Sequence, residues 1–240
     1  MYLFSVFTKI LHFLPSELSH HLALKGLKTL HFFGITSIIT KKKNEQNRLS
    51  NEIFFNLANK VGIAAGLDKN GEYIDSLASL GIGFLEVGTV TPKPQKGNPK
   101  PRIFRNVNEM SILNRLGFNN KGVDYLVKNL KKRNTDIIVG SSIGKNFDTP
   151  IEKASEDYIY CLERVYKYSD YIAINISSPN TEKLRDLSKV EHFDYLLKII
   201  KSKQDDLSVL FGYRPIFIKI SPDESCEDLN NICNSILKNK

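Results

Sequence analysis

Short apolar runs alternate with helical patterns along most of this chain, from Val61 to the last residue. The runs occupy 61–65, 83–87, 137–140, 171–174 and 215–220. Candidate helices follow them at 72–80, 120–132, 151–167, 190–203 and 225–238. Strands that are almost continuously apolar and are separated by helices indicate a parallel sheet with helices covering it. The pattern therefore predicts an α/β fold.

Polar residues at the ends of the predicted strands indicate how this sheet is wound. A doubly wound sheet usually carries a Gly-x-Gly-x-x-Gly turn after its first strand, and the segment AAGLDKNG at 64–71 lacks it. Polar or charged residues follow the strands instead, namely Asp68, Lys69, Thr89, Ser141, Ser142, 175–181 and Lys219. Active groups spread over many strand ends are typical of the (β/α)8 TIM barrel. We therefore expect that fold.

The number of units limits this prediction. Five strand–helix units fall within 61–240, whereas a complete barrel has eight units over about 250 residues. We expect a barrel truncated after about five βα units, with unpaired sheet edges. The predicted organisation is a helical hairpin at 1–40, a connector at 41–60 and a partial barrel at 61–240.

The first forty residues form the predicted helical hairpin. Apolar residues at helical spacing define its first helix, namely Leu3, Val6, Phe7, Ile10, Leu11 and Leu14. Pro15 opens a second helix, which continues the pattern until Gly34. Charged residues interrupt both apolar runs, so neither reaches the length that a membrane-spanning helix needs. A secretory signal is not expected, because no basic segment precedes an apolar block with a cleavage site.

Two interpretations of residues 1–34 remain open. The helices either dock on the main domain or rest in a membrane interface. Four phenylalanines favour the membrane, namely Phe7, Phe13, Phe32 and Phe33. The net charge of +8 gives modest support to a membrane surface and little to nucleic acid, because the lysines are spread along the chain. The three cysteines lack paired spacing, which suggests neither a disulfide framework nor a metal site and fits a reducing compartment.

The densest cluster of uncharged polar residues is NISSPNT at 175–181, directly after an apolar strand. Asn, Ser and Pro are ordinary turn residues, so a simple turn is the first interpretation. The second interpretation is a ligand site at the C-terminal end of the strand, which is where barrel enzymes bind their substrates.

Five segments give the chain its resemblance to a known family. They are AAGLDKNG (64–71), EVGTVTPKPQKGNPKPRIFR (86–105), NRLGFNN (114–120), IGKNFDTP (143–150) and INISSPNT (174–181). In this order they resemble the motifs of dihydroorotate dehydrogenase, specifically its quinone-dependent, membrane-associated class. The N-terminal helix pair agrees with that class, and any one segment alone would be weak support.

The resemblance implies a function. The family oxidises dihydroorotate to orotate in pyrimidine biosynthesis, with FMN as the hydride acceptor and a membrane quinone as the final electron acceptor. It further implies that 61–240 binds FMN and that the protein is attached peripherally to the cytoplasmic face of the bacterial inner membrane. Residues 1–34 would then give the quinone a route from the bilayer to the flavin.

The same resemblance implies the site residues. The cofactor-binding residues would be Ala65, Gly66, Leu67, Asp68, Lys69, Thr89, Ser142, Asn175 and Lys219. The substrate-binding residues would be Lys69, Asn114, Arg115, Leu116, Gly117, Phe118, Asn175 and Asn180. Ser178 matches the catalytic base and would pass its proton on through water near Thr181 and Phe118. Amide side chains suit a dihydropyrimidine, because they both donate to its carbonyls and accept from its ring N–H groups.

Two features depart from the family. Ser142 stands where the family has an asparagine, and the strands that would carry the flavin-phosphate loops are not among the five units. Three hypotheses therefore stay open: a quinone-dependent dihydroorotate dehydrogenase, a non-catalytic remnant acting at most as a peripheral membrane or interaction protein, and a flavin-dependent barrel enzyme for another dihydropyrimidine. We expect the 240-residue chain alone to be an inefficient enzyme.

Overall fold

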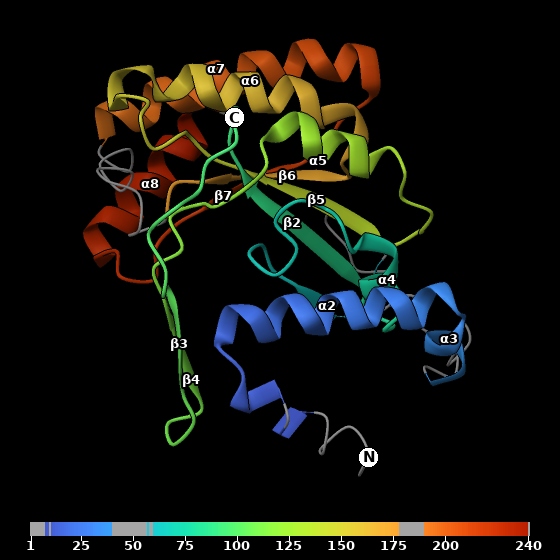
Figure 1. The fold of residues 1–240 in the computed structure, drawn as a ribbon. Helices are drawn as coiled ribbons and strands as arrows, with labels where there is room; N and C mark the ends of the chain where they lie inside the picture. The colour runs from blue at the N-terminus through green and yellow to red at the C-terminus, as the bar shows by residue number, and fades with distance from the viewer. Residues whose placement is uncertain (1–7, 10, 40–56, 58–59, 178–189, 240) are drawn as a thin grey trace.

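A five-stranded parallel sheet forms the centre of the molecule (Figure 1). The computed structural model describes residues 8–9, 11–39, 57, 60–177 and 190–239. The strands of the sheet are β1 (Gly62–Ile63), β2 (Phe84–Val90), β5 (Ile138–Ile143), β6 (Tyr171–Asn175) and β7 (Ile216–Lys219). The helices that follow them are α4 (Ile74–Ala78), α5 (Val123–Leu130), α6 (Ala154–Val165), α7 (Val190–Phe211) and α8 (Cys226–Lys238). The five predicted βα units are therefore confirmed.

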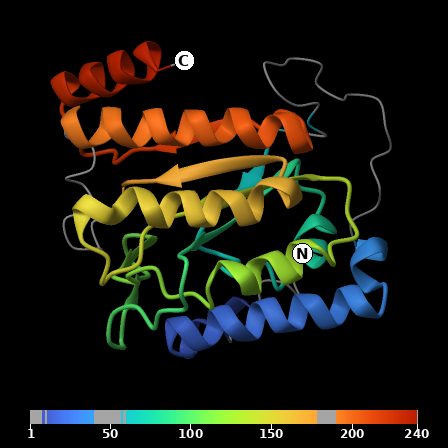
Figure 2. The same cartoon turned by 90° about the horizontal axis from the view of Figure 1, so that it is seen from above.

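The order of the strands shows how the sheet is wound. Within this sheet, each strand pairs in parallel with the sheet strand that follows it in the sequence, in the order β1-β2-β5-β6-β7. A doubly wound sheet would reverse its strand order at a switch point, and the described strands do not. Seen from above, the long helices α2 (Ser16–Phe32), α5, α6, α7 and α8 succeed one another in chain order across the molecule (Figure 2). This is the winding of a (β/α) barrel, left open at β1 and β7 over the described residues.

The core lies between the sheet and its helices. All five residues of β6 are buried, and β5 is buried from Val139 onward. Tyr158, Tyr166 and Phe193 are the largest fully buried side chains, and they come from α6, the turn after it and α7. Strands buried on both faces need continuous apolar sequence, which explains why they were recognisable.

Two elements differ from the sequence prediction. Helix α7 continues to Phe211 rather than ending near 203, because Gln204 and Leu207 beyond that point are again buried. A two-stranded antiparallel hairpin, β3 (Ile103–Asn106) and β4 (Ser111–Asn114), interrupts the connection between β2 and α5 and was not predicted. Its alternation of apolar and polar residues is too short to stand out from the surrounding prolines and glycines.

The N-terminal segment is helical where it is described. Residues 8–9 and 11–13 are helical, α2 begins directly after Pro15, and the short α3 (Ile35–Ile39) follows Gly34. The pairing of two helices at 1–40 falls partly on residues outside the described ranges, and most of the connector at 41–60 does as well. Among the described residues, no helix combines the length and hydropathy needed to cross a membrane.

Helix α2 is docked on the main domain. Leu24 is buried, and Glu17 forms a 2.6 Å ion pair with the buried Arg102. Lys28 also donates a hydrogen bond to the backbone oxygen of Glu72. The opposite side of the helix leaves Leu18 and Leu22 exposed. Docking and an exposed apolar surface therefore occur on the same helix.

Candidate active site and apolar cavity

Three of the predicted cofactor residues meet at the C-terminal edge of the sheet. Thr89, Ser142 and Asn175 come from the neighbouring strands β2, β5 and β6. The hydroxyl oxygens of Thr89 and Ser142 are 2.9 Å apart, and the Asn175 amide donates to the Thr89 hydroxyl at 2.8 Å. All three side chains are buried, so the cluster is a fixed polar patch.

Gly88 makes this close meeting of strands possible. Its φ is +106°, and a side-chain carbon built on it would lie 2.3 Å from the backbone oxygen of Ser142. Only glycine has both the conformational freedom and the absence of a side chain that this position requires. The strand end therefore brings the Thr89 hydroxyl next to the Ser142 hydroxyl.

The loop after β1 carries the predicted flavin-binding residues 65–69. The Gly66 amide donates to the Gly88 oxygen at 2.8 Å, which ties the loop to β2. Gly66 has φ +114°, and no atom lies within 4 Å of a carbon built at its side-chain position. The loop therefore presents bare backbone to open space.

Asp68 attaches this loop to the backbone that leads into α4. Its carboxylate accepts hydrogen bonds from the backbone N–H groups of Glu72 and Tyr73, at 2.9 and 2.7 Å. Burial raises the pKa of the Asp68 carboxyl, while those two hydrogen bonds oppose the rise. Asp68 thus holds the start of α4, and its predicted contact with a cofactor stays a prediction.

Lys69 reaches back over the same loop. Its ammonium group donates to the Gly66 oxygen at 2.9 Å. Burial lowers the pKa of Lys69 to about 8, and the nearby Arg102 guanidinium lowers it further, while Glu17 and Asp68 act in the opposite direction. A lysine with this pKa is a cation at neutral pH and becomes neutral in mildly alkaline solution.

Lys219 is paired with an acid that the sequence analysis did not select. The Lys219 ammonium lies 3.6 Å from one carboxylate oxygen of Glu86, and Tyr171 donates to the other at 3.3 Å. The first oxygen is buried and accepts no hydrogen bond from the described residues. A charge inside an apolar strand is costly without a partner, so Glu86 within β2 was the available signal for this pair.

The predicted substrate segment 114–118 begins at the end of β4. Asn114 lines a cavity, whereas Arg115 is exposed and donates two hydrogen bonds to the Pro101 oxygen, at 3.0 and 3.2 Å. Gly117 and Phe118 are buried. The Phe118 ring and the Thr89 methyl group both lie about 3.0 Å from the position of a carbon built on Gly144. Phe118 is therefore next to the polar patch, and Arg115 faces away from it.

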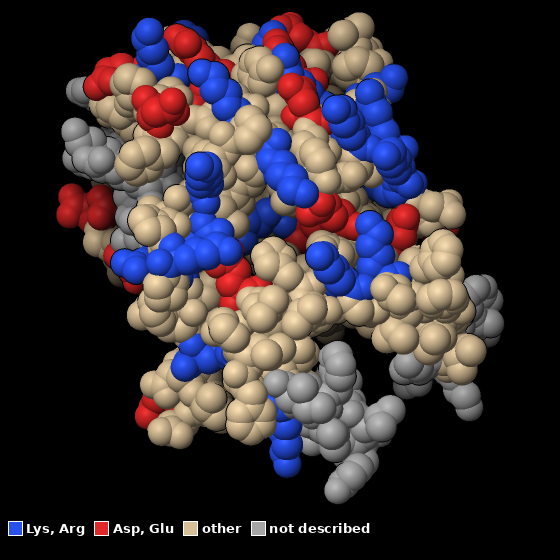
Figure 3. Space-filling view, in the orientation of Figure 1, with Lys and Arg blue, Asp and Glu red and all other residues tan. Residues whose placement is uncertain are grey.

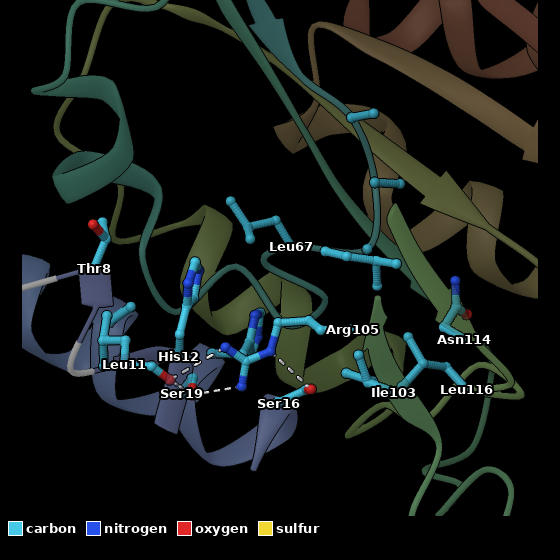
Figure 4. Close-up of a pocket in the computed structure, with 16 residues that line it drawn as sticks. Thr8, Leu11, His12, Ser16, Ser19, Leu67, Ile103, Arg105, Asn114 and Leu116 are labelled. Atoms are coloured by element: carbon cyan, nitrogen blue, oxygen red, sulfur yellow. Dashed lines mark hydrogen bonds between the residues drawn. The ribbon is translucent and has the colours of Figure 1, made fainter. Parts of the chain in front are cut away.

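A cavity of about 540 Å³ separates the N-terminal helices from the loop after β1 (Figure 4). One wall comes from the N-terminal segment, the second from residues 64–67, and the third from the β3–β4 hairpin. Its lining is Thr8, Leu11, His12, Ser16, Ser19, His20, Ala23, Ala64, Ala65, Gly66, Leu67, Ile103, Arg105, Ile112, Asn114 and Leu116. Eight of these residues are aliphatic, and seven polar side chains are placed among them, namely Thr8, His12, Ser16, Ser19, His20, Arg105 and Asn114.

His20 and Arg105 are two of the polar side chains that line this cavity. Burial lowers the pKa of His20 to about 4, helped by the charge of Lys69, so the imidazole is neutral at pH 7. Arg105 donates to the Leu11 and Leu14 oxygens, where the preceding helical turn ends, and to the Ser16 hydroxyl at 3.1 Å. Figure 4 shows its side chain reaching from β3 toward Ser16 and Ser19. Arg105 therefore joins the hairpin to the N-terminal helices.

Comparison with known proteins identifies the family. A family model described as dihydroorotate dehydrogenase matches residues 49–240. The Vibrio atlanticus protein named dihydroorotate dehydrogenase (quinone) is 50% identical over 228 residues, covering 95% of this chain and 67% of the relative. This chain belongs to the dihydroorotate dehydrogenase family. The resemblance inferred from the five motifs is confirmed, and the comparisons favour the dehydrogenase over the non-catalytic remnant.

Other members of the dihydroorotate dehydrogenase family give the same result. The Nitrosospira multiformis protein named dihydroorotate dehydrogenase (quinone) is 44% identical over 239 residues. The crystal structure of the Eimeria tenella dihydroorotate dehydrogenase in complex with ferulenol has a TM-score of 0.70 and 34% identity. The ligand-free structure from the same organism has a TM-score of 0.72. The chain covers 64% and 66% of those two structures and about two thirds of the sequence relatives.

Several predicted site residues of this family member lie outside the described ranges. Ser178, Asn180 and Thr181 are among them, so the catalytic base, one substrate amide and the proposed proton relay stay predictions. The polar patch ends at Ser177, whose hydroxyl donates to the Asn175 side-chain oxygen at 2.9 Å.

A group of buried amides near the site was not predicted from the sequence. Asn146 donates to the Thr91 hydroxyl and to the Gln95 side chain, and Asn120 donates to the same Thr91 hydroxyl at 2.9 Å. These bonds hold the loops after β2 and β5 together. Both asparagines belong to motifs that supported the family resemblance, and that membership was the available signal.

Proposed function

We propose that the protein oxidises dihydroorotate to orotate with FMN as the first electron acceptor and a membrane quinone as the second. In this reaction a proton leaves one ring carbon and a hydride leaves its neighbour, which creates a carbon–carbon double bond. The quinone takes up the two electrons and two protons. Family membership supports the chemistry, and the observation that supports the quinone part most directly is the apolar cavity beside the loop after β1.

The residues at the strand ends fit FMN. Gly66 presents backbone to open space, which a flat ring can approach. Thr89, Ser142 and Asn175 supply buried hydroxyl and amide groups next to it, and Lys219 supplies a cation. When bound, the flavin isoalloxazine accepts the hydride from the substrate and releases electrons one or two at a time. We expect Ser142 to make a weaker polar contact than the longer amide found at this position in the family.

The chain's own residues would position the substrate at the same C-terminal edge of the sheet. Lys69, charged at neutral pH, would bind the carboxylate of dihydroorotate. Asn114 and Asn175 would satisfy ring carbonyl and N–H groups, because an amide both donates and accepts. Ser178 would remove the proton. Phe118, buried beside Thr89, would keep water from this position.

The cavity fits a quinone. Its volume of about 540 Å³ lies within the usual range of ligand pockets, and its aliphatic walls match a ring with an apolar tail. Because residues 64–67 form one wall, a molecule in the cavity would be adjacent to the proposed flavin site. The neutral His20 and the Arg105 guanidinium would donate hydrogen bonds to the quinone oxygens.

A membrane location follows from this proposal. A quinone dissolves among lipid tails, so the cavity must open toward a bilayer. Residues 1–34 would lie at that surface, on the cytoplasmic face of the bacterial inner membrane, with Phe13, Phe32 and Phe33 exposed.

Narrowing the cavity tests the proposal. Ala23→Phe places a ring in the cavity, whereas Leu22→Phe adds one on the exposed side of the same helix. Anaerobic bleaching of the flavin by dihydroorotate should be unchanged in both variants. Reoxidation by a short-chain quinone should slow at least several-fold in Ala23→Phe only. Equal reoxidation rates would remove the cavity from quinone binding, and a protein that purifies without flavin would support the remnant hypothesis.

A further inference from the structure

The β3–β4 hairpin exposes more apolar side chain than a soluble hairpin normally does. Met110 at its turn is 94% exposed and Leu113 is 72% exposed, and Val107 and Ile112 are also exposed. Strand pairing places Phe104 opposite Leu113 on one face and Arg105 opposite Ile112 on the other. A hairpin in water usually hides one face, and an exposed cluster of this kind indicates an interaction surface.

The basic residues around the hairpin are concentrated at its base rather than at its tip. Residues 93–115 contain six basic residues and one acid, Glu109. Four of the basic residues are exposed and lie at the base of the hairpin, outside its two strands, namely Lys93, Lys96, Lys100 and Arg115. In Figure 3 the lower part of the visible face has few charged side chains, and basic side chains cross the face above it. The tip is largely apolar, with Glu109 as its one charged residue, and the base is basic. This arrangement matches a bilayer, in which apolar lipid tails lie beneath anionic headgroups.

The hairpin also lies beside the N-terminal helices. Both project from the same side of the molecule, as Figures 1 and 2 show. Arg105 joins them, and Ile103 and Ile112 form the cavity wall that faces Leu11 and Ser16. Phe13, at the end of the first helical turn, is 90% exposed. The cavity therefore has one wall on each element.

We propose that the β3–β4 hairpin is a second membrane-binding element, which inserts its tip into an anionic phospholipid bilayer beside the N-terminal helices. This rests on the proposed function, since a quinone can reach the cavity from lipid only if both walls meet the bilayer. Four residues in each strand span about 13 Å at 3.3 Å per residue, enough for the tip to enter the headgroup region while the base stays outside. Lys93, Lys96, Lys100 and Arg115 would then bind phosphate groups.

Single tryptophans test this placement, because the chain contains none. Met110→Trp labels the hairpin, Phe13→Trp labels the N-terminal turn, and Val209→Trp labels an 86% exposed position on α7 as the matched control. The 240-residue chain carrying each probe is mixed with vesicles of phosphatidylcholine and phosphatidylglycerol. Emission from positions 110 and 13 should shift to the blue and be quenched by brominated lipid tails, and emission from position 209 should do neither.

The outcomes distinguish insertion of the hairpin from the membrane location proposed for the N-terminal helices. A response at position 13 alone would overturn the hairpin proposal and leave the membrane location of the N-terminal helices intact. No response at either position would overturn both. A blue shift at position 110 that appears without vesicles and grows with protein concentration would show that the hairpin binds a second copy of the chain, which also overturns the proposal.

A charge at the tip gives an independent measurement. Met110→Glu should weaken co-sedimentation with the same vesicles on the order of tenfold, because insertion of a large apolar side chain is lost. Val209→Glu adds the same charge at an equally exposed position and should change binding little. Binding to pure phosphatidylcholine should be weaker for all chains, since the basic base then has no anionic partner. Equal loss in the two glutamate variants would contradict insertion at the hairpin tip.

Discussion

At the scale of single residues, burial beside the cavity shifts two basic groups toward their neutral forms. Burial lowers the pKa of His20 to about 4 and that of Lys69 to about 8, and the charge of Lys69 adds to the shift of His20. Neither shift follows from the sequence, where both residues stand among polar neighbours. We therefore expect His20 to make the stability of the fold depend on pH, and Lys69 to make orotate binding depend on pH.

His20 should make folding sensitive to mild acid. Between pH 6.5 and 4 the unfolded chain binds a proton at His20 and the folded chain does not, so the free energy of unfolding should fall as the pH is lowered through this window. His20→Gln should flatten that fall, whereas His192→Gln, an exposed histidine on α7, is the matched control. Urea unfolding at a series of pH values measures it. Equal slopes in His20→Gln and the parent would show that His20 is not buried as a neutral group.

Lys69 should make orotate binding sensitive to mild alkali. Its ammonium loses its proton near pH 8, so the affinity of the flavin-loaded protein for orotate should fall above that pH, by up to roughly tenfold per pH unit. Lys69→Arg keeps its charge and should remove this dependence, even if it lowers the affinity overall. Titration of the flavin spectrum with orotate measures both proteins. An unchanged profile in Lys69→Arg would exclude Lys69 as the carboxylate ligand.

At the scale of elements, Arg105 joins two segments that are distant in sequence. Its guanidinium donates to the Leu11 and Leu14 oxygens at the end of a helical turn, which the Ser19 hydroxyl also reaches. This connection fixes both walls of the cavity. The hairpin is thus a structural support of the N-terminal segment as well as a proposed membrane contact.

Removing this guanidinium should loosen the N-terminal segment locally. Arg105→Leu removes the charged hydrogen bonds to the Leu11 and Leu14 oxygens, which then keep only neutral donors, at a cost of about 1.5–3 kcal/mol. Amides of residues 11–19 should therefore exchange with deuterium faster, while those of α6 should not. Arg115→Leu is the matched control, because its hydrogen bonds go to the Pro101 oxygen within the exposed loop. Exchange measured by mass spectrometry distinguishes the two. Unchanged exchange at 11–19 in Arg105→Leu would mean that other contacts hold the segment.

At the scale of the whole molecule, the N-terminal helices and the main domain are not independent. Leu24 is buried against the domain, and deletion of residues 1–34 would leave the buried Arg102 without its Glu17 partner. Such a deletion would destabilise the protein as well as release it from membranes. Substitutions on the exposed side of α2 avoid this difficulty.

Leu18→Glu with Leu22→Glu should release the protein from vesicles while keeping its fold. Both side chains are exposed, so the docked face of α2 is untouched. Pelleting with anionic vesicles should fall at least several-fold, because two apolar contacts are replaced by charges that the lipid headgroups repel. Val209→Glu with Leu210→Glu, at exposed positions on α7, is the matched control. Equal pelleting of both double variants would favour a helix pair that only docks on the domain.

The sequence by itself determined the α/β class, the five βα units and the positions of Thr89, Ser142, Asn175 and Lys219 at successive strand ends. These follow from local periodicity, because strands buried on both faces are largely apolar and most of their polar residues stand near the C-terminal end. The five motifs also identified the family. All of these features can be recognised from local sequence patterns.

Only the tertiary structure decided which groups meet. Three features join residues that are far apart in sequence. They are the ion pair of Glu86 with Lys219, the hydrogen bonds of Arg105 to the N-terminal helical turn, and the cavity wall that the β3–β4 hairpin forms. No local pattern encodes such contacts, because they depend on how strands register and where a short hairpin projects. The shifted pKa values of His20 and Lys69 have the same origin, since burial is a property of the packed molecule rather than of a sequence segment.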